Sequence, residues 1–317
     1  MLWQANSNER KIQKSAKFIN FFAKNDVNLL IFYKNILFNK IFGDKMENII
    51  LDGKSLSIKI LDKLKVEMAE KKPQKKIAII SVGDDYGSEV YCNMKKKKSE
   101  YIGLNCEIFN FKEIEQYALE QKIKELSADK NYGGIMVQHP LPKTLDEKKC
   151  FNLIPCNKDI DGLSAESFGL MAQGRPKYVP ATALAIMKIL EEYNINIVGE
   201  TVLVIGKSQI VGLPLSIMLM KAGATVTVAH SRTKDLKDMV KNYKIVIVAI
   251  GKPEFIKADW FADGQIIIDA GYNAGNVGDV EKLAYQKASF YTPVPGGVGP
   301  MTIAMLLSQA VNAVQEN

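Results

Sequence analysis

Histidine and cysteine, which build most metal and disulfide centres, are scarce in this sequence. Its 317 residues include only two histidines, His139 and His230, and four cysteines. A three-histidine zinc site and an HExxH motif are therefore excluded, and a Ser-His-Asp triad could use only one of these two residues. The cysteines form no CxxC pair and no cluster with histidine, so we expect no metal site and reduced, packed thiols at Cys92, Cys106, Cys150 and Cys156.

A strong charge imbalance is also missing from most of the chain. The sequence has 42 Lys and Arg against 35 Asp and Glu, a net charge of +7. Residues 1–45 hold eight of these bases and three of the acids, which leaves 34 bases and 32 acids in the remaining 272 residues. A basic groove along the main body is not supported, so we expect no nucleic-acid partner.

Residues 1–45 differ in composition from the rest of the chain. They hold six of the 13 phenylalanines and no secretory pattern, and charged residues interrupt any apolar run long enough to span a membrane. A single Arg beside three acids does not fit a transit peptide. We interpret the segment as an atypical leader outside the fold, either appended or created by a mis-assigned start before Met46, with a membrane-surface helix as the alternative. The cytoplasm is the default location, and the leader leaves an organelle open.

After Met46, the sequence alternates between strand and helix patterns. Buried strands are expected at 76–83, 104–111 and 133–140, and helices at 88–103, with Ser88 as its N-cap and Gly103 as its stop, and at 114–130. A second series begins with a helix at 182–195. It continues with strands at 201–206, 225–230, 245–251 and 265–271, helices at 211–222 and 235–242, and a terminal helix at 301–317.

This alternation predicts an α/β protein with two α/β domains and a ligand cleft between them. We expect a catalytic domain of residues 46–182 plus 299–317, with the C-terminal helix packing back on it. Residues 183–298 would form a Rossmann-type cofactor domain.

The segment VIGKSQIVGLP (204–214) follows a strand and opens a helix, where a dinucleotide-binding fold places its phosphate loop. Gly206 permits a tight turn, and amides at the helix N-terminus could bind a pyrophosphate. The alternative is a helix that Ser208 merely caps. The next strand ends without an acid at His230-Ser231-Arg232, and Lys207 lies in the loop, which favours NADP over NAD.

The candidate chemistry lies in the first half. Ser88, Tyr91 and Lys95 share one face of the 88–103 helix, where a tyrosine ring could wall a flat ligand and desolvation could lower the pKa of the lysine. Lys95 begins a run of four lysines, and a solvated run is the alternative. Gln138 ends a buried strand, where it could bind a ligand or be a core amide with partners inside the protein. Asp161 lies in the loop KDIDG, where it could bind a ligand or be a turn residue.

Together these motifs closely resemble one family, over essentially all of 46–317. The most specific blocks are GDDYGSEVYCNMKKK (83–97), GGIMVQHPLP (133–142), KDIDG (158–162), GKSQIVGLP (206–214) and TPVPGGVGPMT (292–302). The family is the bifunctional methylenetetrahydrofolate dehydrogenase/methenyltetrahydrofolate cyclohydrolases. The resemblance implies a homodimeric, NADP-dependent enzyme that oxidises 5,10-methylenetetrahydrofolate and hydrolyses the product to 10-formyltetrahydrofolate. Such an enzyme would serve purine, methionine and histidine biosynthesis.

The resemblance also implies roles for individual residues. Lys95 would assist water attack and proton transfer, with Gln138 tuning it, Tyr91 lining the folate ring and Asp161 anchoring the pterin. Ser88, Pro295, Gly296 and Gly297 would complete the substrate site. The expected cofactor residues are Gly206, Lys207, Ser208, Ile210, Val211, His230, Ser231, Arg232, Gly251 and Thr302.

Two departures from the family pattern stand out. Pro180-Ala181-Thr182-Ala183 replaces a common Pro-Cys-Thr-Pro, and Lys207 stands where arginine is common, which loses a bidentate fork for phosphate. A shikimate-type dehydrogenase would share the two-domain architecture, but it would not explain the Tyr91–Lys95 and PGGVGPM blocks together. A non-catalytic folate or nucleotide sensor is the alternative from another class.

Overall fold

The structure is a computed structural model that describes residues 48–83 and 86–316. The leader predicted at 1–45 lies outside the described residues. Residues Asn48–Asn317 form one compact unit that contains two separate parallel sheets.

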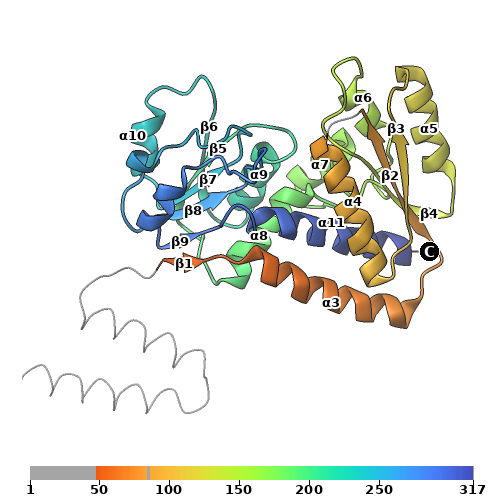
Figure 1. Cartoon of the computed structure of the whole chain (residues 1–317), viewed down its shortest axis with the longest axis horizontal. Helices are drawn as coiled ribbons and strands as arrows, with labels where there is room; N and C mark the ends of the chain where they lie inside the picture. The colour runs from red at the N-terminus through yellow and green to blue at the C-terminus, as the bar shows by residue number, and fades with distance from the viewer. Residues whose placement is uncertain (1–47, 84–85, 317) are drawn as a thin grey trace, which may run out of the picture. The chain divides into compact units, whose positions relative to one another are not determined.

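The smaller sheet has three parallel strands in the order β3-β2-β4 (Figure 1). Apolar, β-branched runs form the buried strands β2 (Lys76–Val82) and β4 (Tyr132–Val137), and β3 (Cys106–Phe111) pairs with the other edge of β2. The crossover helices are α4 (Tyr86–Ile102) and α5 (Gln116–Ala128). The predicted β-α-β-α-β unit is confirmed.

Helix α4 differs from the prediction at its start and agrees at its end. It begins at Tyr86, two residues earlier than expected, so Ser88 lies in its first turn and the prediction that Ser88 precedes the helix as its N-cap is wrong. Tyr86 and Gly87 already have helical backbone, so the helix begins before Ser88 and not at it. At the other end the backbone turns left-handed at Gly103 (φ 79°), whose amide bonds to the carbonyl of Glu100, and Gly103 stops the helix as predicted.

The larger sheet has six parallel strands in the order β1-β9-β8-β7-β5-β6. The four predicted strands are β5 (Thr201–Ile205), β6 (Thr225–Ala229), β7 (Ile245–Val248) and β8 (Ile266–Asp269). The two short strands at one side of this sheet, β1 (Ile49–Ile50) and β9 (Phe290–Tyr291), were not predicted, because two residues leave no periodicity to detect. Since β5 lies between β6 and β7, the strand order reverses there, as at the ligand-binding edge of a dinucleotide fold.

The C-terminal helix α11 (Val298–Gln315) packs against α3 (Gly53–Lys71), α8 (Ala181–Glu192) and β4, so it returns to the first half of the chain (Figure 1). A side chain at Gly133 of β4 would lie 2.6 Å from the carbonyl oxygen of Ala313, which explains how the helix reaches the strand backbone. Buried Gln309 donates to the carbonyl oxygens of Ile160 and Val179 and accepts from the Val179 amide, each at 2.9 Å. The predicted fold class is therefore confirmed.

The remaining elements connect these layers. They are α6 (Glu147–Asn152), α7 (Ala165–Gln173), α9 (Gly212–Lys221), α10 (Leu236–Lys241) and two short 3-10 helices, η1 (Ala258–Trp260) and η2 (Lys282–Lys287). Within 48–83 and 86–316, no helix combines the length and apolar character needed to cross a bilayer.

Candidate active site

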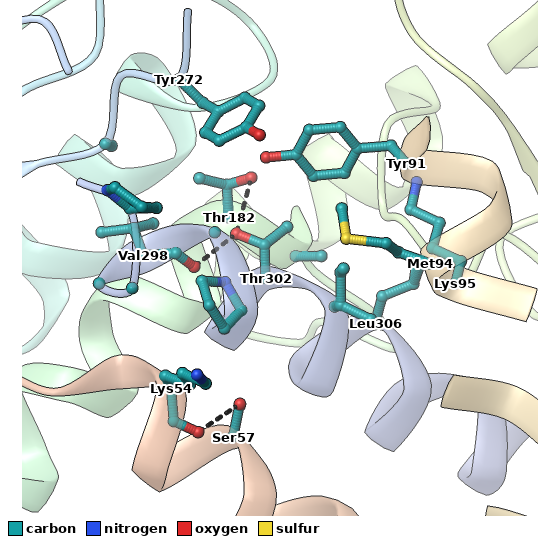
Figure 2. Close-up of a pocket in the computed structure, with 18 of the residues that line it drawn as sticks. Lys54, Ser57, Tyr91, Met94, Lys95, Thr182, Tyr272, Val298, Thr302 and Leu306 are labelled. Carbon is teal, nitrogen blue, oxygen red and sulfur yellow. Dashed lines mark hydrogen bonds between the residues drawn. The ribbon is translucent and has the colours of Figure 1, made fainter. Parts of the chain in front are cut away.

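A pocket of about 600 Å³ lies where the two halves of the compact unit meet. Its walls come from α3, α4, the ends of β4 and β8, and the loop that leads into α11. Figure 2 shows side chains from several of these elements around one cavity, with Tyr91 and Lys95 on α4 and Thr302 on α11.

Lys95 is the buried cation of this pocket. Its side chain comes from the turn of α4 that follows Tyr91, and the residue is only 6% exposed. Its Nζ donates to Gln138 Oε1 at 2.8 Å and lies 3.6 Å from Met136 Sδ. Lys96, Lys97 and Lys98 are exposed, so the solvated interpretation holds for the rest of the run and not for Lys95. Burial lowers the Lys95 pKa, while Asp161 and two thiols oppose that shift.

Gln138 is held at the end of β4 by its own backbone and side chain. Its amide N–H donates to the Ile80 carbonyl at 2.7 Å, and its Nε2 donates to the carbonyl oxygen of His139 at 2.8 Å. With Nε2 engaged, Oε1 faces Lys95 as an acceptor. The Gln138 side chain therefore has hydrogen-bond partners within the protein, and its oxygen holds the Lys95 amine beside the pocket.

Asp161 lines the same pocket from the loop after β4. Burial raises its pKa to about 6, and the Lys95 ammonium opposes that shift. One carboxylate oxygen accepts from the Ala181 amide at 3.3 Å. Neighbouring Asp159 is fully buried and accepts from Ser164 N at 2.8 Å and Ser167 Oγ at 2.7 Å, which orders the loop that carries Asp161.

The tyrosine of α4 forms one wall of the pocket. Burial raises the pKa of Tyr91 to about 12, so its hydroxyl is neutral at physiological pH. Its ring meets the ring of Tyr272 edge-on, with the centroids 5.3 Å apart and the planes at 90°. Tyr91 thus supplies an apolar, uncharged face beside the Lys95 amine.

The Gly/Pro block before α11 closes the opposite side. Pro295, Gly296 and Gly297 all line the pocket, and the Lys54 amide donates to the Gly296 carbonyl at 2.8 Å. Thr302, expected on the cofactor side, also lines this pocket and donates to the Val298 carbonyl at 3.2 Å. The structure therefore brings Thr302 and Ile210 together with the expected substrate residues.

The other expected cofactor residues lie outside this lining, at the carboxyl ends of neighbouring strands. Gly206 follows β5, and its amide donates to the Ala229 carbonyl at the end of β6 at 2.9 Å. A side chain at Gly206 (φ 132°) would lie 2.2 Å from the Ala249 carbonyl oxygen beyond β7, so the three strand ends meet too closely for any residue but glycine. The residues grouped there are Lys207, Ser208, Val211, His230, Ser231, Arg232 and Gly251.

This edge fits a dinucleotide with a 2′-phosphate. Lys207, Ser231 and Arg232 are exposed at adjacent strand ends, and neither cation forms a salt bridge among the described residues. His230 is partly buried, and its Nδ1 accepts from the Arg232 amide at 3.2 Å. Two cations and a hydroxyl suit the chemistry of a phosphate monoester.

The first amides of the following helix have hydrogen-bond partners within the chain. Ser208 Oγ accepts from Val211 N at 3.1 Å and Gly212 N at 3.5 Å, and the Ser208 carbonyl accepts from Leu213 N at 3.0 Å. Pro214 has no N–H to offer. The Ser208 hydroxyl thus engages the Val211 and Gly212 amides from outside α9, whose N-cap is Val211, and pyrophosphate binding at this helix start stays a prediction.

Several pocket residues were not expected from the sequence. Lys54, Thr182 and Tyr272 all line the pocket, and Thr302 Oγ1 lies 3.4 Å from Thr182 Oγ1 (Figure 2). A signal existed for Tyr272, since it follows β8 at the carboxyl edge of the sheet where ligands bind. Ser88 lies on α4, but its side chain lies outside the described part of the chain.

Comparison with known proteins agrees with this arrangement. The family model of the tetrahydrofolate dehydrogenase/cyclohydrolase catalytic domain matches residues 51–161, and that of the corresponding NAD(P)-binding domain matches residues 180–317. A bifunctional protein FolD from Leptospira interrogans serogroup Icterohaemorrhagiae serovar copenhageni is 43% identical over 278 residues, which cover 86% of this chain and 98% of the relative.

Two solved structures extend the comparison. FolD from Campylobacter jejuni is 38% identical with a TM-score of 0.80, over 84% of this chain and 98% of that one. The Trypanosoma brucei methylenetetrahydrofolate dehydrogenase-cyclohydrolase, solved with NADP and an inhibitor, is 31% identical with a TM-score of 0.80, over 84% and 97%. The chain therefore belongs to the tetrahydrofolate dehydrogenase/cyclohydrolase (FolD) family, as a bifunctional, NADP-dependent enzyme of folate one-carbon metabolism.

Proposed function

We propose that the pocket around Lys95 carries both reactions of the family. In the first, a hydride leaves the methylene carbon of 5,10-methylenetetrahydrofolate, NADP⁺ accepts it, and the methenyl cation forms. In the second, water adds to that carbon, the bond to one ring nitrogen breaks, and 10-formyltetrahydrofolate and a proton are released. The observation that carries the proposal is the buried Lys95 amine, fixed 2.8 Å from Gln138 Oε1 inside the pocket.

Lys95 is the proton-handling group of the second reaction. A lysine with a lowered pKa has a larger neutral fraction near neutral pH, so its amine can take a proton from the adding water. The resulting ammonium gives that proton to the departing ring nitrogen, and the other proton of the water goes to solvent. Gln138 keeps the amine in place, and only this step requires an acid or base.

The first reaction depends on position and not on proton transfer. It requires the donor and acceptor carbons to be held together in a site that tolerates a developing cation. Tyr91 supports the flat substrate with a neutral ring, and the Asp161 carboxylate accepts hydrogen bonds from the pterin. Ser88, Pro295, Gly296 and Gly297 complete the substrate site in this proposal.

NADP supplies the hydride acceptor, and the strand ends beyond β5, β6 and β7 would hold it. Lys207, Ser231 and Arg232 would bind the 2′-phosphate, and Gly206 and Gly251 would let the backbone approach the dinucleotide. Ser208, Val211 and His230 would shape the phosphate loop. Ile210 and Thr302 would border both ligands, since they line the pocket as well.

The organisation of the chain forms part of the same proposal. Residues 46–182 with 299–317 are the catalytic domain, and residues 183–298 are the cofactor domain. We further propose a cytoplasmic homodimer without a nucleic-acid partner, whose product serves purine, methionine and histidine biosynthesis. Analytical ultracentrifugation of the full chain tests the dimer, since a monomer at micromolar concentration would contradict it.

Turnover by the purified full-length chain tests the proposed function. The enzyme is given 5,10-methylenetetrahydrofolate with NADP or NAD, and the methenyl and 10-formyl products are followed separately. We expect NADP-dependent formation of the methenyl compound and its accelerated hydrolysis. Turnover of neither compound would support the sensor alternative, and methenyl formation without accelerated hydrolysis would restrict the enzyme to the dehydrogenase.

A further inference from the structure

Tyr272 joins the two sides of the pocket through an aromatic contact. It lies in the loop after β8, in the half that contains the six-stranded sheet, whereas Tyr91 lies on α4 beside the three-stranded sheet. The two rings meet edge to face at 5.3 Å, and Figure 2 shows them pointing toward each other across the cavity. The contact therefore spans the place where substrate and cofactor must meet.

The loop that carries Tyr272 is held from several directions. The Tyr272 hydroxyl donates to Asn276 Oδ1 at 2.8 Å, and the preceding Gly271 amide donates to buried Asp269 at 2.9 Å. The following residue, Asn273, donates through Nδ2 to Asp279 Oδ1 at 3.1 Å and through its amide to the Val277 carbonyl at 2.9 Å. Tyr272 is nevertheless 44% exposed, so its ring is fixed mainly by its own loop and by Tyr91.

The two reactions make different demands on this contact. Hydride transfer needs the reacting carbons of the folate and the cofactor to be held close together, and these two ligands bind to different halves. Water attack needs only the folate side, where Lys95 lies on α4 and Gln138 directly follows β4. A residue that links the halves should therefore affect the first reaction more than the second.

We propose that Tyr272 is a positioning residue for hydride transfer, which acts by holding the Tyr91 ring edge-on between the folate and cofactor sides of the pocket. This inference rests on the proposed function. An edge-to-face pair is worth roughly a 2- to 12-fold change in an equilibrium constant, which sets the size of the expected effect.

Two substitutions of Tyr272 separate the ring from the hydroxyl. Tyr272→Leu removes the aromatic edge but keeps an apolar side chain, and Tyr272→Phe keeps the edge but loses the bond to Asn276. We expect Tyr272→Leu to lower the dehydrogenase kcat about fivefold, with the KM for folate changed less than about twofold. Cyclohydrolase activity, assayed on the methenyl compound without nucleotide, should stay within about twofold, and Tyr272→Phe should restore the dehydrogenase kcat.

Phe255 provides a matched control. It is an equally exposed aromatic residue in the same half, and its ring meets that of Trp260 at an interplanar angle of 76°, outside the pocket. Phe255→Leu should leave both activities unchanged. A double-mutant cycle of Tyr272→Leu with Tyr91→Leu should be non-additive in the dehydrogenase kcat, because either change alone breaks the contact.

The outcomes distinguish this inference from the proposed function. If wild-type protein shows neither activity, the proposed function fails before the variants are compared. If the wild type shows both activities and Tyr272→Leu lowers both equally, lowers neither, or adds to Tyr91→Leu without coupling, the positioning role is overturned.

Discussion

The Lys95 amine and the Gln138 side-chain oxygen lie 2.8 Å apart at the end of a buried strand, in a pocket that also contains Asp161. Neither residue is an ordinary occupant of a protein core, since lysine is almost never buried without a partner. The pairing gives the buried amine an oxygen acceptor and leaves it beside the cavity. This relationship is the structural basis for assigning proton transfer to Lys95.

Replacing Gln138 with leucine should impair the second reaction more than the first. The change removes the acceptor that fixes the Lys95 amine, and a hydrogen bond to a charged or strongly polar group of this kind corresponds to roughly a 10- to 100-fold effect. We expect cyclohydrolase activity to fall by about that factor, while the dehydrogenase falls less. Steady-state assays of both reactions check this, with exposed Gln121→Leu as the control. An equal fall in both activities would count against the tuning role.

Most of the architecture could be predicted from the sequence because buried parallel strands are short apolar runs between helices. Helix α3 was nevertheless missed, although Leu61, Leu64 and Met68 lie at helical spacing and Asp52 accepts from the Ser55 amide as its N-cap. The helix begins with polar residues and follows a strand of only two residues, so the alternation of long strands and helices did not reveal it.

The site was less accessible to prediction than the fold. Helical spacing with Tyr91 singled out Lys95 within the lysine run, but a solvated run stayed the alternative, because only the packed helix determines which lysine is buried. The Tyr91–Tyr272 contact joins a helix and a loop that are distant in sequence, so no local pattern reports it. The hydrogen bond from the Val211 amide to Ser208 Oγ could not be predicted either, because it depends on the side-chain rotamer and the local backbone.

The acidic limb of the pH profile should depend on Asp161. Its pKa is raised to about 6, so its carboxylate is protonated as the pH falls below that value and loses its ability to accept hydrogen bonds from the pterin. We expect kcat/KM for the folate substrate to fall below about pH 6 in the wild type. Rate measurements between about pH 5 and 8 on wild type and Asp161→Asn, at roughly half-unit steps, check this. Survival of the same inflection in Asp161→Asn would assign it to another group.

Lys207 should distinguish NADP from NAD. If its ammonium binds the 2′-phosphate, Lys207→Ala should raise the KM for NADP roughly tenfold and leave the KM for NAD nearly unchanged. Lys244→Ala is a suitable control, because Lys244 precedes β7 at the opposite edge of the sheet and pairs with Glu200. Equal losses with both nucleotides would instead place Lys207 against a phosphate that the two cofactors share.

Gln309 should be important for stability, since it ties α11 to the loop near Asp161. Gln309→Ala leaves three buried backbone groups, at Ile160 and Val179, without partners and should lower the free energy of unfolding by about 2–4 kcal/mol. Urea unfolding monitored by circular dichroism checks this. Exposed Asn312→Ala on the same helix should change stability by less than about 0.5 kcal/mol. Comparable losses in the two variants would contradict the role of Gln309.

The most direct test of the central claim compares both activities of Lys95→Ala with those of the wild type and of the exposed neighbour variant Lys96→Ala. General acid–base catalysis contributes roughly 10²- to 10⁴-fold, so cyclohydrolase activity should fall by at least about 100-fold in Lys95→Ala. A measurable NADP-dependent dehydrogenase activity should survive, and Lys96→Ala should retain both. Retention of both activities in Lys95→Ala would contradict the assignment of proton transfer to Lys95.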